Sequence, residues 1–202
     1  MLLGVLAGSA LAPIGLLVAR STAHTELSRR HKLLLTAAAA LGGAACSLWP
    51  AALLAPATLT IVLAIPATAI DALEHRIPNV LSLLLAAGVP VTLVCACDLA
   101  QFLRVLGGAA AWGGLLLAAF LATGEPGPGD IKLAPSLGML ASWGSWQTLV
   151  TAVVATYLLA AVVGLIGVIG GRISLRAGRI ALGPAMVAAT VAAVTVSSCI
   201  RT

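Results

Sequence analysis

Charged residues are scarce in this chain. Asp, Glu, Lys and Arg together make up 8% of its 202 residues, whereas hydrophobic residues make up 61% and the mean hydropathy is +1.13. A soluble domain normally devotes about a quarter of its residues to charge, because charged side chains separate its apolar interior from water. The composition therefore excludes an ordinary soluble domain and predicts an integral membrane protein.

Polar stretches long enough to form a separate soluble domain are also missing. A helix needs about 20 mostly apolar residues to cross the hydrocarbon layer, and a helix satisfies its own backbone groups there. Apolar runs predict eight spans, at 2–19, 33–49, 51–70, 79–97, 105–122, 131–146, 148–170 and 180–199. Seven spans remain an alternative, because the sixth run is short and the turn at Pro50 is tight.

These runs predict a single all-α domain over 1–202, folded as a polytopic helical membrane bundle. Residues 1–50 would form two amino-terminal helices joined by a short basic loop, and residues 51–202 a six-helix core that carries the candidate catalytic residues. No positive charge precedes the first run, so we expect it to stay attached, with the amino terminus outside, rather than to act as a cleaved signal peptide.

Cysteine and histidine are few, and neither residue type is arranged as an obvious metal site. The four cysteines, which lie in or beside apolar runs without a C-x-x-C pair, are Cys46, Cys95, Cys97 and Cys199. We expect them to be small packing residues. The three histidines are His24, His31 and His75, all in predicted loops. A site built from the first two is an alternative, but we expect headgroup-facing side chains, no metal and no cofactor.

Basic residues outnumber acidic ones by 11 to 6 and give a formal charge of +5. They lie in short loops between apolar runs, so retention of those loops in the cytoplasm explains them better than binding to nucleic acid. Threading eight spans from an outside amino terminus leaves only Arg104 and Arg201 outside. The other nine fall on the cytoplasmic side: Arg20, Arg29, Arg30, Lys32, Arg76, Lys132, Arg172, Arg176 and Arg179.

Two of the six acidic residues are placed to act together. Asp71 and Asp130 are separated by two predicted spans, so the chain returns to the same face between them, whereas Asp98 lies one crossing away from Asp71. Two neighbouring carboxyl groups share a proton, so one can deprotonate water while the other polarises a scissile carbonyl. This topology predicts Asp71 and Asp130 as a catalytic pair at the cytoplasmic surface, and excludes Asp98 as the partner.

The residues just before Asp130 are expected to shape this site. Glycine reaches torsions that side chains forbid, so Gly127 and Gly129 should let the backbone pass close to another part of the chain. Pro128 should hold Gly127 in extended geometry. Each feature also has a simpler explanation, because an aspartate at a helix end is often a cap and Gly-Pro-Gly is often a turn.

Together, the two aspartate segments resemble the motifs of type IV prepilin leader peptidases. The first segment is Asp71-Ala-Leu-Glu-His-Arg-Ile77-Pro78-Asn79, and the second is Gly127-Pro-Gly129-Asp130-Ile-Lys132-Leu133. Gly183-Pro184, at the start of the last predicted span, is similar to the Gly-Pro that opens a late helix in this family, and Gly8-Ser9 is similar to part of its first helix. The resemblance covers most of the chain from residue 51 onward.

The resemblance implies an aspartic endopeptidase of the bacterial inner membrane. Such an enzyme cleaves the basic leader of a type IV prepilin or pseudopilin at the cytoplasmic face, typically just after a glycine. The substrate would enter as a membrane helix, so the expected partners are that helix and the lipid bilayer, with no nucleic acid. Nothing in the sequence indicates the oligomeric state.

The resemblance also assigns roles to individual residues. Asp71 and Asp130 would be catalytic. Glu74 and Glu125 lie near these two aspartates in the sequence, and from that position they could attract the basic leader. The supporting residues would be Gly127, Pro128, Gly129, Lys132, Ile77, Pro78 and Asn79. For both glutamates, solvated loop charges are the simpler alternative.

One departure from the family concerns the loop between the first two spans. Many members carry paired, zinc-binding cysteines there and some methylate the new amino terminus, but the loop at 20–32 has no cysteine. We therefore do not expect methyltransferase activity.

Three other functions remain as alternatives. Presenilin-like proteases share the Gly-x-Gly-Asp motif, but they carry a Pro-Ala-Leu motif that this sequence lacks. Preflagellin peptidases are closer relatives. A proton-coupled transporter would place its acidic residues near the middle of the bilayer rather than at span ends.

Overall fold

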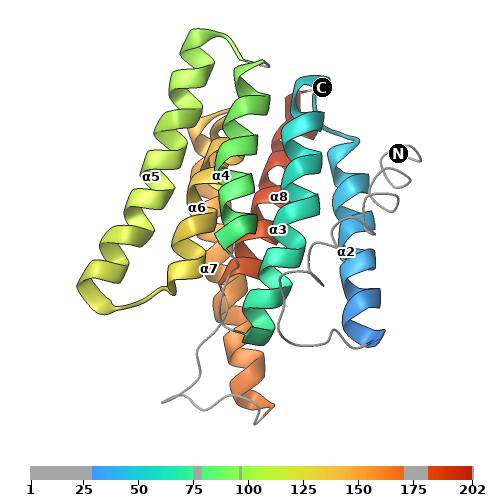
Figure 1. Ribbon diagram of the computed structural model, residues 1–202, viewed down its shortest axis with the longest axis vertical. Helices are drawn as coiled ribbons and strands as arrows, with labels where there is room; N and C mark the ends of the chain where they lie inside the picture. The colour runs from blue at the N-terminus through green and yellow to red at the C-terminus, as the bar shows by residue number, and fades with distance from the viewer. Residues whose placement is uncertain (1–28, 75–78, 96, 171–181, 202) are drawn as a thin grey trace.

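The computed structural model describes residues 29–74, 79–95, 97–170 and 182–201, and within these ranges the chain is helical and has no strand (Figure 1). The helices are α2 (Arg29–Cys46), the 3₁₀ helix η1 (Ala51–Leu53), α3 (Leu54–Glu74), α4 (Asn79–Val94), α5 (Leu99–Thr123), α6 (Pro128–Ser142), α7 (Trp146–Ile169) and α8 (Gly183–Arg201). The predicted first span at 2–19, with Gly8 and Ser9, and residues 20–28 of the basic loop lie outside the described residues.

Successive helices alternate in direction along the bundle (Figure 1). The carboxyl end of α3 therefore lies at the same end of the bundle as the amino ends of α4, α6 and α8. The connection between α4 and α5 lies at the other end. The all-α membrane bundle predicted from composition is confirmed for the part of the chain that the structure describes.

Membrane-spanning length is reached by four of the described helical segments: Ala51–Thr68, Leu99–Thr123, Trp146–Ile169 and Gly183–Ile200. Two further apolar helical segments, Ala37–Cys46 and Asn79–Val94, are shorter. Large aliphatic side chains on α5 and α7, such as Leu103, Val154 and Leu165, are at least half exposed, as lipid-facing residues would be. These described helices do not confirm the predicted count of eight spans.

Helix α6 lies at the centre of the bundle. It packs against α3, α4, α5, α7 and α8, and eleven of its 15 residues are buried. At 1.5 Å per residue it is only about 22 Å long, which is shorter than the hydrocarbon layer. Its surroundings are therefore mostly protein, which suits a helix rich in small residues and containing a carboxylate.

The boundaries of α5 differ from the sequence prediction because two charged residues act locally. We expected a span from 105, but α5 begins at Leu99, where Asp98 is the N-cap and its carboxylate accepts a hydrogen bond from the Gln101 amide at 2.7 Å. Arg104, predicted as an outside loop charge, instead donates from Nε to the Ser142 carbonyl at 3.0 Å. Its guanidinium also binds the Trp143 carbonyl, so Arg104 satisfies the carboxyl end of α6.

Candidate active site

The two candidate aspartates belong to helix ends at the same end of the bundle. Asp71 lies in the last turn of α3 and Asp130 in the first turn of α6, and these two helices pack against each other. The side chains of Asp71 and Glu74 lie outside the described part of the structure, as do Ile77 and Pro78 entirely. The backbone thus agrees with the even number of crossings expected from the sequence.

Asp130 is buried although it lies at a helix end. Only 4% of the residue is exposed, and its amide donates to the Gly127 carbonyl at 3.1 Å. The N-cap of α6 is Gly127, so Asp130 occupies the third helical position and not the capping position. Burial of a carboxyl group is costly, and such groups gather at functional sites. Asp98, by contrast, is an exposed helix cap near the opposite end of the bundle.

A hydrogen bond joins the two sequence motifs. Nζ of Lys132 donates to Oδ1 of Asn79 at 2.6 Å, although the two residues are 53 positions apart in the chain. Asn79 is the first residue of α4, and Lys132 lies in the first turns of α6. Both side chains are exposed, so this hydrogen bond joins the two motifs at the surface of the protein.

The glycines beside Asp130 do not act as the sequence suggested. Gly127 has φ −62° and ψ 155°, an extended conformation that any residue adopts, and it is extended as expected before Pro128. Gly129 is a buried helical residue of α6. The expectation of special torsions at Gly127 and Gly129 is therefore wrong. Within the described ranges, the glycine with positive φ is Gly124, at 77°, where α5 ends.

This difference arises because the turn is completed before the Gly-Pro-Gly sequence begins. The Gly124 amide donates to the Phe120 carbonyl at 2.7 Å and closes α5 in a left-handed conformation. Pro128 then occupies the first turn of α6, where its fixed φ suits a helix start. Glu125 is exposed in the loop between the two helices, and its amide donates to Thr123 Oγ1 at 3.2 Å.

Gly183, which the sequence did not assign to the site, lies against Asp130, and Thr68 lies beside Gly183. A Cβ built on Gly183, the first residue of α8, would be 3.6 Å from Asp130 Oδ1 and 3.1 Å from Thr68 Cγ2. Thr68 is buried on α3, three residues before Asp71. The three-residue spacing is the sequence signal that could have pointed to Thr68, because such residues share one helix face.

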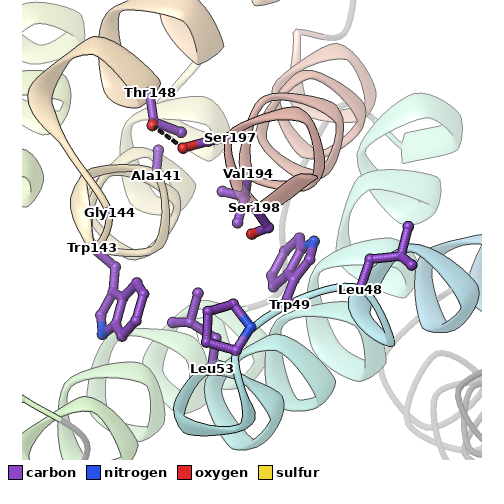
Figure 2. A pocket seen from close by; sticks show the side chains of 11 residues that line it. Leu48, Trp49, Leu53, Ala141, Trp143, Gly144, Thr148, Val194, Ser197 and Ser198 are labelled. Carbon is purple, nitrogen blue, oxygen red and sulfur yellow. Dashed lines mark hydrogen bonds between the residues drawn. The ribbon is translucent and has the colours of Figure 1, made fainter. Parts of the chain in front are cut away.

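A cavity of about 360 Å³ lies near the opposite end of the bundle, away from Asp130. Figure 2 shows the rings of Trp49 and Trp143 on either side of it, and the Thr148 hydroxyl hydrogen-bonded to Ser197 at 3.0 Å on its far wall. The cavity has no carboxyl group in its lining. It therefore does not form part of the candidate active site.

Comparison with known protein families identifies one match. Residues 57–169, more than half of the chain, match the type IV leader peptidase family, and the matched segment contains both Asp71 and Asp130. Comparisons with curated proteins and with solved structures found no match. The matched segment, together with the apolar helices, shows that the chain belongs to the type IV leader peptidase family of membrane aspartic proteases.

Proposed function

We propose that this protein is an aspartic endopeptidase that removes the basic leader of a type IV prepilin or pseudopilin at the cytoplasmic face of the bacterial inner membrane. The observation that carries the proposal is the buried carboxyl group of Asp130 at the start of α6. It lies at the end of the bundle where α3, the helix of Asp71, also ends, and within the segment that matches the family.

Asp71 and Asp130 would act as one coupled unit. One carboxylate takes a proton from water, and the resulting hydroxide adds to the scissile carbonyl carbon while the protonated partner gives its proton to the carbonyl oxygen. Collapse of the tetrahedral intermediate breaks the C–N bond, and the proton taken from water passes to the leaving amine. The carbonyl oxygen returns its proton, so the pair again shares one proton.

The surrounding residues suit a peptide that approaches from the end of the bundle. The hydrogen bond between Lys132 and Asn79 would hold the start of α4 against α6 beside the reacting carbonyl. Glu74 and Glu125 belong to segments at the same end and would attract the positive charges of the leader. The apolar stem of the substrate would lie in lipid beside the bundle.

A proton-coupled transporter is less well supported. Coupling carboxylates are expected near the middle of the bilayer, facing a pathway between helices. Asp130 instead lies in the first turn of its helix, near one end of the bundle. We therefore do not propose transport.

The proposed topology has eight spans, an outside amino terminus and an active site that faces the cytoplasm. It predicts that reporter domains fused after position 25 and after position 175 are cytoplasmic, whereas a reporter fused near position 99 is external. The paired use of alkaline phosphatase and a fluorescent protein as reporters measures each side independently. A cytoplasmic reporter at position 99 would contradict the pairing of Asp71 with Asp130.

The proposed activity is tested by expressing the chain together with each prepilin-like protein of its own genome. We expect a mobility shift of leader size for at least one substrate, which the Asp130→Asn variant does not produce. Mass spectrometry should place the new amino terminus after the leader and find it unmethylated, because the loop at 20–32 has no cysteine. Absence of a shift with every candidate would refute the proposed substrate class.

A further inference from the structure

The start of α8 contacts both helices that carry the proposed catalytic pair. Helix α8 packs against both α3 and α6 (Figure 1). It begins at Gly183, and the Met186 amide already donates to the Leu182 carbonyl at 3.0 Å. A Cβ on Gly183 would be 3.1 Å from Thr68 Cγ2 on α3, and 3.5 Å from Leu133 Cδ1 and 3.6 Å from Asp130 Oδ1 on α6.

A side chain at position 183 would make a tight contact with Thr68. Ordinary van der Waals contacts of a Cβ begin at about 3.4 Å, so a separation of 3.1 Å forces Thr68 or α8 to move by a few tenths of an ångström. The Thr68 methyl group cannot rotate away freely, because its hydroxyl donates to the Ile65 carbonyl at 2.9 Å and fixes χ1. Thr68 is also buried, with 5% of the residue exposed. A Cβ at position 183 therefore requires the Thr68 side chain, and α3 or α8 with it, to shift by this small amount.

We propose that Gly183 is a positioning residue of the proposed active site, and that its lack of a side chain sets the separation between α3 and α6 beside Asp71 and Asp130. Thr68 lies one turn before Asp71 on α3, so a shift at Thr68 is transmitted to the backbone that carries Asp71. The same Cβ would lie 3.6 Å from Asp130 Oδ1 on α6, an ordinary van der Waals contact. Since a misplacement of about 1 Å can lower a rate about 100-fold, a shift of a few tenths of an ångström at this point should lower turnover several-fold.

This inference rests on the proposed peptidase activity. A positioning role and a merely structural role of Gly183 predict different experimental results. A structural glycine would change the amount of folded protein but not the catalytic properties of each folded molecule. A positioning glycine would change kcat while leaving KM nearly constant, because the substrate is bound by other parts of the protein.

The experiment compares Gly183→Ala, Thr68→Ser and the double variant, purified and assayed on a prepilin that the wild-type protein cleaves. Thr68→Ser deletes Cγ2 and keeps the hydroxyl that binds the Ile65 carbonyl, so it restores space for a Cβ at position 183. We expect Gly183→Ala to lower kcat by about 3- to 10-fold at nearly constant KM, because the displacement is only a few tenths of an ångström. The double variant should recover most of that loss, which a double-mutant cycle reports as a coupling between the two sites.

A matched control is available on another helix. Gly114 of α5 has nothing within 4 Å of its Cβ position, so Gly114→Ala should leave kcat unchanged. If Gly183→Ala alone does not fold, Gly183→Ala and Gly183→Ser are compared in the Thr68→Ser background, where kcat should fall as the side chain grows. Equal kcat values for the two would overturn the inference.

The pH dependence of kcat gives a second readout. Two carboxyl groups that share a proton have apparent pKa values that are driven apart by their mutual repulsion, and activity requires the singly protonated pair. Wider separation weakens the repulsion between two ionised carboxylates, so the upper apparent pKa should fall, whereas the lower one should change less because loss of the first proton leaves a single charge. The bell-shaped profile of Gly183→Ala should therefore be narrower than that of the wild type, and the double variant should widen it again.

The outcomes separate this inference from the proposed function. If the wild-type chain is folded and cleaves no prepilin, the proposed function is wrong and the positioning role falls with it. If the wild type cleaves and Gly183→Ala has the same kcat and the same pH profile, the proposed function stands and the positioning role is overturned. A loss in Gly183→Ala that Thr68→Ser does not relieve would also overturn it.

Discussion

Asp71→Asn and Asp130→Asn should each abolish leader cleavage, while Asp98→Asn should cleave nearly normally. An amide has almost the shape of a carboxyl group, but it neither accepts a proton from water nor donates an acidic proton. Each substitution at the pair therefore removes half of one coupled mechanism. We expect a loss of about 1000-fold or more for either variant, and little further loss in the double variant, because groups that act as a unit are not additive.

The measurement is the initial rate of leader removal by purified variants at equal concentrations of folded protein. Asp98→Asn is the matched control, because Asp98 is an exposed N-cap and asparagine caps helices as well as aspartate does. Wild-type activity should also fall at both pH extremes, where the pair is doubly protonated or doubly ionised. Near-normal cleavage by Asp71→Asn or by Asp130→Asn would remove that residue from the proposed mechanism.

The sequence was enough to predict that the two aspartates lie at helix ends on the same side. The number of apolar runs between them gives the number of membrane crossings. Two apolar runs separate Asp71 from Asp130, and the described helices α4 and α5 occupy that interval. The end of the bundle on which each residue lies follows from this count. The depth of burial of Asp130 does not follow from it, since burial depends on α8, a helix that begins 53 residues later in the chain.

Local chemistry explains the errors at the ends of α5 and α6. Hydropathy starts a span after the last charge, so the prediction began at 105 and treated Arg104 as a loop residue. In the structure, Arg104 lies within α5 and its long side chain reaches the last carbonyl groups of α6. Likewise, Gly-Pro-Gly was interpreted as a loop with unusual torsions, although a proline suits the first turn of a helix.

The sequence can place Thr68 on the face of α3 that carries Asp71, but it does not show which helix that face contacts. Thr68 looks like any small residue in an apolar run, and its role arises only because α8 begins beside it. The Gly183-Pro184 pair was noticed through resemblance, but resemblance does not say what the glycine touches. Close approach depends on the placement of two backbones, which residue type and periodicity alone do not determine.

A second large effect is expected where α5 meets α6, because Gly108 and Gly138 let the two backbones touch. A Cβ on Gly138 would lie 2.5 Å from the Gly108 carbonyl oxygen and 3.0 Å from the Gly108 carbonyl carbon. A Cβ on Gly108 would in turn lie 2.6 Å from the Gly138 carbonyl oxygen. The nearest atoms to a Cβ on Gly138 all belong to the backbone, so no rotamer change relieves the overlap, and the helices would have to separate.

We therefore expect Gly138→Ala to destabilise the folded protein by about 1–3 kcal/mol, which is the usual cost of overpacking, and Gly138→Val to destabilise it more. Thermal unfolding of the purified protein in detergent measures the effect. Gly114→Ala is the control, because its Cβ meets open space and alanine favours a helix over glycine by up to about 1 kcal/mol. An unchanged unfolding temperature for Gly138→Ala would show that α5 and α6 do not pack closely here.

Gly138→Val and Asp130→Asn should lose activity for different reasons, although both residues belong to α6. Separation of α5 from α6 removes the packing around a helix that is buried along most of its length, so Gly138→Val should lose abundance and activity together. Asp130→Asn should accumulate and unfold like the wild type while cleaving nothing. If Asp130→Asn instead lost its fold, the buried carboxyl group would have to be reinterpreted as a structural element of the bundle.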